Sequence, residues 1–128
     1  MAAYINHIAT ATPSHECQRS FVRSLPAWVP DSGVAEKLQF IARRSGIDRR
    51  YTVLNPLLGP PGSGAFYEFG QFPGTGRRMA AYRDAALPLA LEAIRRLPRS
   101  ARVSDVTHLV VTSCTGFYAP GLDVELIE

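Results

Sequence analysis

The chain has 128 residues, 46% of them hydrophobic and 20% charged, which is the composition of an ordinary globular domain able to bury a core. No apolar run approaches the roughly 20 residues of a membrane-spanning helix, and the first residues lack the pattern of a secretory signal. Two cysteines are too few for a disulfide framework, so we expect a cytoplasmic protein. The net charge of +3 is modest.

The N-terminal segment predicts a strand followed by a short helix. Residues Ala3–Thr10 alternate well enough for a strand, which Pro13 would end. A helix is expected over Gln18–Trp28, with its length limited by Pro26 and Pro30.

The clearest helical signal follows Asp31 and Ser32, either of which can cap the first turn. Gly46 supplies the C-terminal stop, and residues 47–54 are expected to be extended. The helix would carry an apolar stripe of Val34, Leu38, Ile41 and Ala42.

Residues 55–76 concentrate glycine and proline and predict a long loop. A second long helix is expected over Thr75–Leu97, with Pro88 inside it as a source of a kink. Its expected buried face consists of Met79, Tyr82, Ala86, Ala90, Ala93 and Leu97.

Residues 106–114, VTHLVVTSC, are β-branched and nearly uninterrupted, which predicts a central strand buried on both faces. A helix with Asp123 near its cap is expected to follow Pro120, and the chain stops within its first turns. This order of elements predicts a layered α/β fold that is incomplete.

Cys114, at the end of that strand, could be a nucleophile or the wall of a pocket. A reactive cysteine needs a cation, a histidine or a helix N-terminus beside it. His108 lies too far along the strand and the next helix begins too late. The residues themselves therefore favour pocket lining.

The remaining candidates differ in strength. His15 and Cys17 have no second ligand pair for a metal, and the Gly-rich run 59–64 lacks the ending of a P-loop. Lys37 and Arg44, seven residues apart on one helix face, could hold phosphate groups, or could be a solvated face. Arginine suits phosphate, and Lys37 is the only lysine among 14 basic residues.

Four segments, in order, resemble the type III polyketide synthases, the chalcone and stilbene synthase family, especially its bacterial members. They read IATATP, RRSGIDRRY, RRMAAYRDAALPLALEAI and VTHLVVTSCTGFYAPGLD, and the last is the strongest match. The SGIxxR pattern also occurs in ketoacyl-ACP synthase III, but the ordered set is more specific. Residues 1–128 would form the N-terminal portion of a thiolase-like α/β domain.

The resemblance implies a homodimeric acyltransferase that condenses a starter acyl-CoA with malonyl-CoA, with loss of carbon dioxide and without a cofactor or metal. The CoA-binding cations of the family fall on Lys37 and Arg44, and a third basic position falls on Phe40, which weakens the clamp or shifts it to Arg43. The pocket positions fall on Cys114 and Thr115.

Further positions of the family concern the dimer and the reaction. The residue that reaches into the partner's pocket, often Met in plant enzymes, falls on Ala119, where a small side chain would reshape that pocket. No residue of this chain falls on a catalytic position, because the family's nucleophilic Cys, His and Asn are expected beyond Glu128.

Three alternatives stay open on the sequence alone. A ketoacyl-ACP synthase III would share the fold and would use malonyl-ACP. A basic module that binds nucleic acid would use the arginine pairs, although these do not form a continuous stripe with interleaved aromatics. A non-catalytic paralogue would only dimerise.

Overall fold

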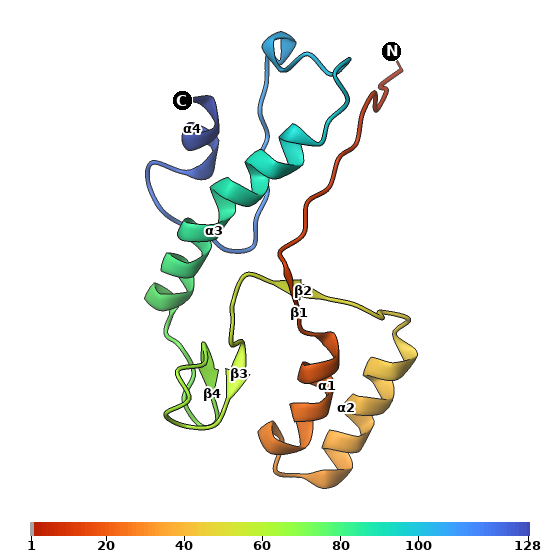
Figure 1. Cartoon of the computed structure of the whole chain (residues 1–128), viewed down its shortest axis with the longest axis vertical. Helices are drawn as coiled ribbons and strands as arrows, with labels where there is room; N and C mark the ends of the chain where they lie inside the picture. Colours follow the sequence, from red (N-terminus) through yellow and green to blue (C-terminus); the bar gives the residue numbers. More distant parts are fainter. Residues whose placement is uncertain (1) are drawn as a thin grey trace. The chain divides into compact units, whose positions relative to one another are not determined.

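A computed structural model describes residues 2–128, which form two compact units (Figure 1). One unit is Pro13–Gly74. The other consists of Thr75–Glu128 together with the N-terminal segment that ends at Thr12.

A helical hairpin is the centre of the Pro13–Gly74 unit. Helix α1 (Gln18–Trp28) packs on helix α2 (Ser32–Arg44), and the bounds of α1 are those predicted. Leu25 of α1 and Ala35 of α2 are buried. The Gln39 side chain also donates a hydrogen bond from Nε2 to the Val22 carbonyl, 3.2 Å away, so a polar contact joins the two helices as well.

Local signals set both ends of α2. Asp31 is the N-cap, and its carboxylate accepts a hydrogen bond from the Val34 N–H at 3.0 Å. At the other end Gly46 takes a φ of +67°, a left-handed conformation that glycine adopts without strain. The capping residue and the C-terminal stop expected from the sequence are therefore confirmed.

Replacing Asp31 with alanine should lower the free energy of unfolding by about 1 kcal/mol, because an N–H of the first helical turn loses its acceptor. Urea denaturation followed by circular dichroism measures the change. Ser32→Ala, at the next position, is the control and should stay within about 0.5 kcal/mol of the parent chain. Equal losses in the two variants would show that the cap bond does not stabilise α2.

Two pairs of very short strands complete this unit. Strand β1 (His15–Glu16) is antiparallel to β2 (Tyr51–Thr52), and β3 (Leu58–Gly59) is parallel to β4 (Tyr67–Glu68). The extended segment expected after α2 thus contains β2.

The glycine-rich segment 55–76 is largely the long loop that its composition predicts, but it contains the short strands β3 and β4. The Glu68 carboxylate accepts hydrogen bonds at 2.9 Å from the N–H groups of Gly62 and Gly64, both of which have positive φ. Trp28 of α1 makes an edge-on contact with Phe69, with ring centroids 4.7 Å apart. One carboxylate and one aromatic contact therefore order the segment locally.

The second unit is built on the long helix α3 (Thr75–Arg95), which runs past Pro88 and ends two residues before the predicted Leu97. A 3-10 helix η1 (Val103–Asp105) and the short helix α4 (Leu122–Ile127) follow. The predicted inner face of α3 is half-buried rather than buried.

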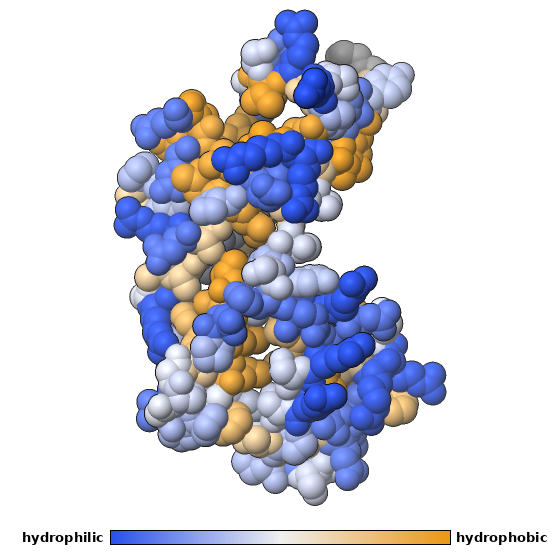
Figure 2. Space-filling model, viewed as in Figure 1, coloured by the Kyte–Doolittle hydropathy of each residue, from blue (hydrophilic) through white to orange (hydrophobic). Residues whose placement is uncertain are grey.

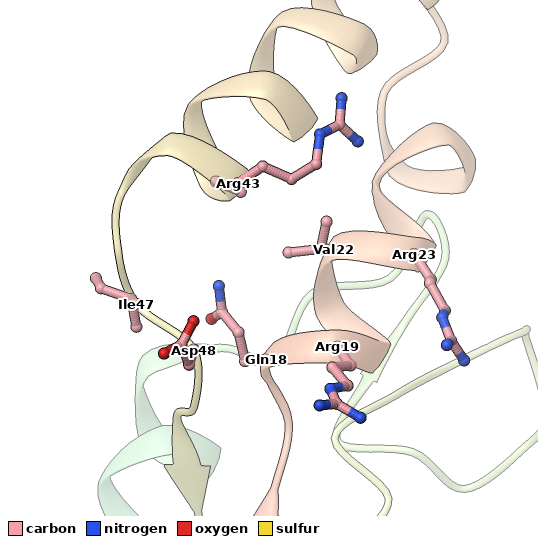
Figure 3. Close-up of a pocket in the computed structure, with 8 residues that line it drawn as sticks. Gln18, Arg19, Val22, Arg23, Arg43, Ile47 and Asp48 are labelled. Atoms are coloured by element: carbon pink, nitrogen blue, oxygen red, sulfur yellow. The ribbon is translucent and has the colours of Figure 1, made fainter.

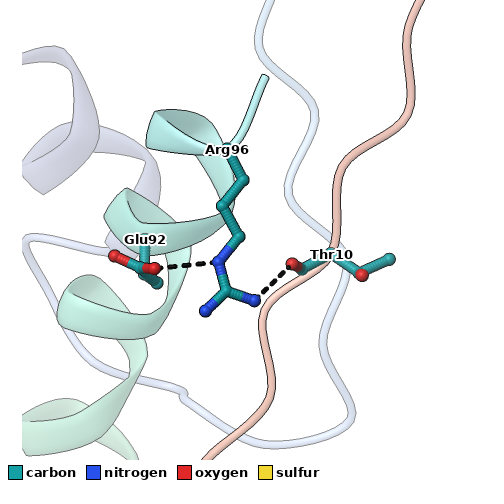
Figure 4. A network of polar contacts seen from close by, with 3 residues as sticks. All are labelled: Thr10, Glu92 and Arg96. Carbon is teal, nitrogen blue, oxygen red and sulfur yellow. Dashed lines mark hydrogen bonds and ion pairs between the residues drawn. The ribbon is translucent and has the colours of Figure 1, made fainter. Parts of the chain in front are cut away.

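Arg96 joins the N-terminal segment to the end of α3. Its guanidinium pairs with Glu92 at 2.8 Å and donates a hydrogen bond to the Thr10 carbonyl at 3.2 Å (Figure 4). The contact links residues 86 positions apart, so it fixes the end of the N-terminal segment beside α3.

Two sequence predictions are wrong in this structure. Residues Ala3–Thr10 and 106–114 are extended but form no strand within the described part of the chain, and Val110 is 85% exposed rather than buried. A strand needs a neighbour for its backbone N–H and C=O groups, and no segment of residues 2–128 pairs with either one. β-propensity alone therefore did not produce a strand.

Much hydrophobic surface is open to solvent as a result. Figure 2 shows it in orange over both units, and large exposed side chains include Ile5, Ile8, Phe72, Val110 and Phe117. Each sheet found in residues 2–128 has two strands, so the thiolase-like layered α/β fold stays a prediction. None of the described helices combines the length and the apolar character required to cross a membrane.

Candidate phosphate-binding face and pocket segment

Lys37 and Arg44 lie on the exposed side of α2, away from the side that contacts α1. Their seven-residue spacing is close to two helical turns, or roughly 10 Å along the axis. Two long cationic side chains at that spacing can contact separate phosphate groups of one ligand. The predicted common face of Lys37 and Arg44 is therefore present.

Phe40 lies between these two cations on the same face and is 54% exposed. The guanidinium carbon of Arg44 is 5.3 Å from the centroid of the Phe40 ring, which is a cation–π geometry. Phe40 thus contacts the Arg44 guanidinium and does not provide a third positive charge on this face. No ion pair occupies Lys37 or Arg44 within residues 2–128, so both charges can bind an anion.

Arg43 is placed elsewhere. It lines a hollow between α1 and α2 together with residues of α1, and it does not share the face of Lys37 and Arg44. The structure therefore gives no support to the alternative in which Arg43 replaces the missing third cation.

Cys114 is exposed, and its thiol has a polar contact with the neighbouring Thr115 hydroxyl at 3.8 Å. That hydroxyl is neutral and cannot stabilise a thiolate by charge. His108 instead contacts the Thr107 hydroxyl at 2.9 Å. The observed surroundings supply Cys114 with no activating group in the described chain, and a pocket wall formed by Cys114 and Thr115 stays a prediction.

The turn after Cys114 is shaped by close packing on α3. Gly116 has a φ of +100°, and a Cβ atom placed there would lie 2.2 Å from a ring carbon of Tyr82. Tyr82 also contacts Tyr118, with ring centroids 6.3 Å apart, and the Arg83 guanidinium lies 5.7 Å from the Tyr118 ring. The segment that follows the candidate pocket residues is therefore held by α3.

The Tyr118 hydroxyl donates a hydrogen bond to the Glu125 carboxylate in α4, 3.0 Å away. Burial raises the pKa of Tyr118 above its ordinary value, and the Glu125 carboxylate raises it further, because both disfavour the phenolate. The phenol therefore stays a donor at neutral pH and joins the turn to α4. Ala119, the predicted dimer residue, is exposed beside it, and its role stays a prediction.

The Tyr118 contact should give the chain a pH-dependent stability. A folded pKa above about 10 means that the contact stabilises the fold fully below pH 10 and is lost as pH rises through the folded pKa. The Tm difference between the parent chain and Tyr118→Phe should therefore stay constant up to about pH 9 and shrink as the pH rises above about 10. Tyr4→Phe, at a residue 82% exposed, is the control. A difference that is constant with pH would contradict this assignment.

The chain is similar to proteins that are named as polyketide synthase-like. The proteins named alpha-pyrone synthesis polyketide synthase-like Pks18 of Mycobacterium tuberculosis and Mycobacterium bovis are 31% identical over 132 aligned residues. The alignment covers 98% of this chain and 32% of each relative, so the chain spans about a third of their length. No family model matches the chain. No solved structure matches it.

Some residues that the structure brings together were not expected from the sequence. They are Gln18, Arg19 and Arg23 of α1, which meet Arg43 at the hollow, and the Tyr118–Glu125 pair. The spacing of Gln18 and Val22 does place them on one side of a helix, but which helix they face is a tertiary property. Residues 2–128 contain no group of three His, Cys, Asp or Glu side chains that could hold a metal ion.

Proposed function

We propose that this chain is the N-terminal part of a type III polyketide synthase, an acyltransferase that condenses a starter acyl-CoA with malonyl-CoA. The observation that carries the proposal is the similarity to polyketide synthase-like proteins over 98% of the chain. The ordered motifs from IATATP to SCTGFYAPGLD support the same assignment.

In this proposal Lys37 and Arg44 bind phosphate groups of CoA. Their positions on one exposed helix face, with Phe40 holding the Arg44 guanidinium, support this role. CoA carries a diphosphate and a 3′-phosphate, so two cations roughly 10 Å apart can contact different phosphate groups. Cys114 and Thr115 would line the acyl pocket, and Ala119 would face the partner subunit of a cytoplasmic homodimer.

The chemistry would be supplied by a Cys, a His and an Asn elsewhere in the complete protein. The Cys thiolate would attack the starter thioester, forming an acyl-enzyme and releasing CoA. Loss of carbon dioxide from malonyl-CoA leaves an enolate, which forms a carbon–carbon bond to the acyl carbon as the enzyme C–S bond breaks. Preorganised donors would stabilise the enolate and the oxyanion. The CoA thioesters are substrates in this reaction, and no cofactor takes part.

The choice of extender distinguishes this function from its nearest alternative. The complete protein should consume malonyl-CoA in the presence of a starter acyl-CoA, and malonyl-ACP should not support the reaction. The 128-residue chain alone should give no malonyl-CoA-dependent product, because Cys114 has no activating neighbour within the described residues. Turnover that requires malonyl-ACP would favour a ketoacyl-ACP synthase III.

A binding module for nucleic acid predicts a different result with the same chain. Its affinity for DNA or RNA would fall steeply with salt, and CoA would not compete. We expect no such binding, because the arginine pairs are divided between the two units and are not interleaved with aromatic residues along the sequence. Salt-dependent binding of nucleic acid that CoA does not displace would contradict the proposal.

A further inference from the structure

A hollow of about 340 Å³ lies between α1 and the end of α2. Figure 3 shows Gln18 at its centre, Asp48 beside it, and Arg43 reaching across from the last turn of α2. Arg19 and Arg23 of α1 form the rest of the polar rim. The carbon surface of the hollow comes from Val22, Ala42 and Ile47. This volume is large enough for a ligand of several heavy atoms.

Gln18 is the residue that marks the hollow as a site. It is only 7% exposed, and its Oε1 atom has no hydrogen-bond partner within residues 2–128. A buried amide oxygen without a donor is destabilising, and such groups are rare in folded proteins. If the Gln18 amide turns toward the hollow, a ligand that brings a hydroxyl or an N–H group there would supply the missing donor.

The rim of the hollow is positively charged. Arg19, Arg23 and Arg43 have no carboxylate partner in the described chain, and Asp48 is the one acidic residue among the eight that line the hollow. A phosphate monoester carries a charge of about −1.5 to −2 at neutral pH and three acceptor oxygens, which suits several guanidinium groups better than a single carboxylate does.

We propose that this hollow binds a small hydroxylated phosphate monoester. Arg43 would hold the phosphate, with Arg19 and Arg23 adding positive charge beside the hollow, and Gln18 would accept a hydrogen bond from a hydroxyl group of the ligand. Val22 and Ile47 would contact its carbon atoms. Asp48 would accept a hydrogen bond from a second hydroxyl and would reject ligands with further anionic groups.

This site is separate from the face of Lys37 and Arg44, neither of which lines the hollow. The inference therefore does not depend on the proposed polyketide synthase function. A chain that failed to use CoA could still bind a phosphate monoester in this hollow, and the reverse also holds.

Titration of the ¹⁵N-labelled chain with glycerol 3-phosphate tests the proposal, with inorganic phosphate and glycerol as partial ligands. Glycerol 3-phosphate should shift the amide signals of α1 and of the end of α2. Inorganic phosphate should bind about fivefold more weakly, because it lacks the hydroxyl that reaches Gln18, and glycerol should not bind measurably. Absence of binding by glycerol 3-phosphate would overturn the proposal.

Three variants assign the contacts. Arg43→Ala should weaken binding about tenfold, whereas the adjacent Arg44→Ala should leave it unchanged. Gln18→Leu keeps the side-chain volume and removes the unpaired oxygen, so it should fold, and should bind glycerol 3-phosphate no better than inorganic phosphate. If Arg44→Ala weakened binding as much as Arg43→Ala, the phosphate would bind on the Lys37 face instead. If Gln18→Leu bound glycerol 3-phosphate as tightly as the parent chain, the hydroxyl group would not contact Gln18. Either result overturns the site as proposed.

Discussion

Replacing Lys37 and Arg44 together with alanine should raise the KM of the complete protein for the acyl-CoA of the proposed reaction about tenfold while changing kcat little. Both side chains lie on an exposed helix face, where a charge-assisted contact to a phosphate contributes less than in a buried site. Two such contacts of about 0.7 kcal/mol each correspond to about a tenfold change in affinity. Because they would bind CoA equally in the ground state and the transition state, the chemical step should be unaffected.

A matched pair of cations controls for the loss of charge itself. Arg95 and Arg99 are also exposed, and Arg95→Ala with Arg99→Ala removes the same two charges from the other unit. Steady-state kinetics at two salt concentrations should show a raised KM in the Lys37/Arg44 variant alone. A similar rise in the control variant would mean that net charge attracts CoA and that Lys37 and Arg44 form no specific site.

Gly116→Ala should destabilise the chain more than Asp31→Ala does, lowering the free energy of unfolding by about 2–4 kcal/mol. The φ of +100° is strained for any residue with a Cβ atom. That atom would also lie 2.2 Å from a Tyr82 ring carbon and within 2.8 Å of two more, so Tyr82 would have to leave its place beside the turn.

Gly76→Ala is the matched control for this substitution. Gly76 belongs to the same unit, lies in the first turn of α3, and has no atom within 4 Å of the position a Cβ would take. The alanine there should stabilise the chain by about 0.5 kcal/mol. Thermal unfolding of both variants, and of Gly116→Ala combined with Tyr82→Ala, separates the clash from the backbone strain. A stable Gly116→Ala variant would contradict the packing of this turn on α3.

The helices could be predicted because their signals are local. Asp31 and Gly46 are adjacent to the ends of α2 and mark both of them, and Pro30 lies just beyond the end of α1, whereas α1 runs past Pro26. The strands at Ala3–Thr10 and 106–114 could not be predicted this way. Their β-branched residues describe a propensity, whereas a strand also requires a hydrogen-bonding neighbour, which residues 2–128 do not provide.

The candidate sites also differ in whether local sequence signals or contacts between elements form them. Helical spacing was enough to place Lys37 and Arg44 on one face, because both belong to α2. The Gln18 hollow depends on which side of α1 meets α2, and the Tyr118–Glu125 bond depends on how a turn folds back on α4. Neither contact follows from periodicity, so the structure was needed to find them.

Membership of this chain in a polyketide synthase is tested most directly by mass spectrometry of the product formed from ¹³C-labelled malonyl-CoA. The complete protein, given an acyl-CoA starter, should release a product that has gained labelled two-carbon units, with one carbon dioxide lost for each unit. A complete protein that binds CoA thioesters but incorporates no label from malonyl-CoA would contradict the proposed function.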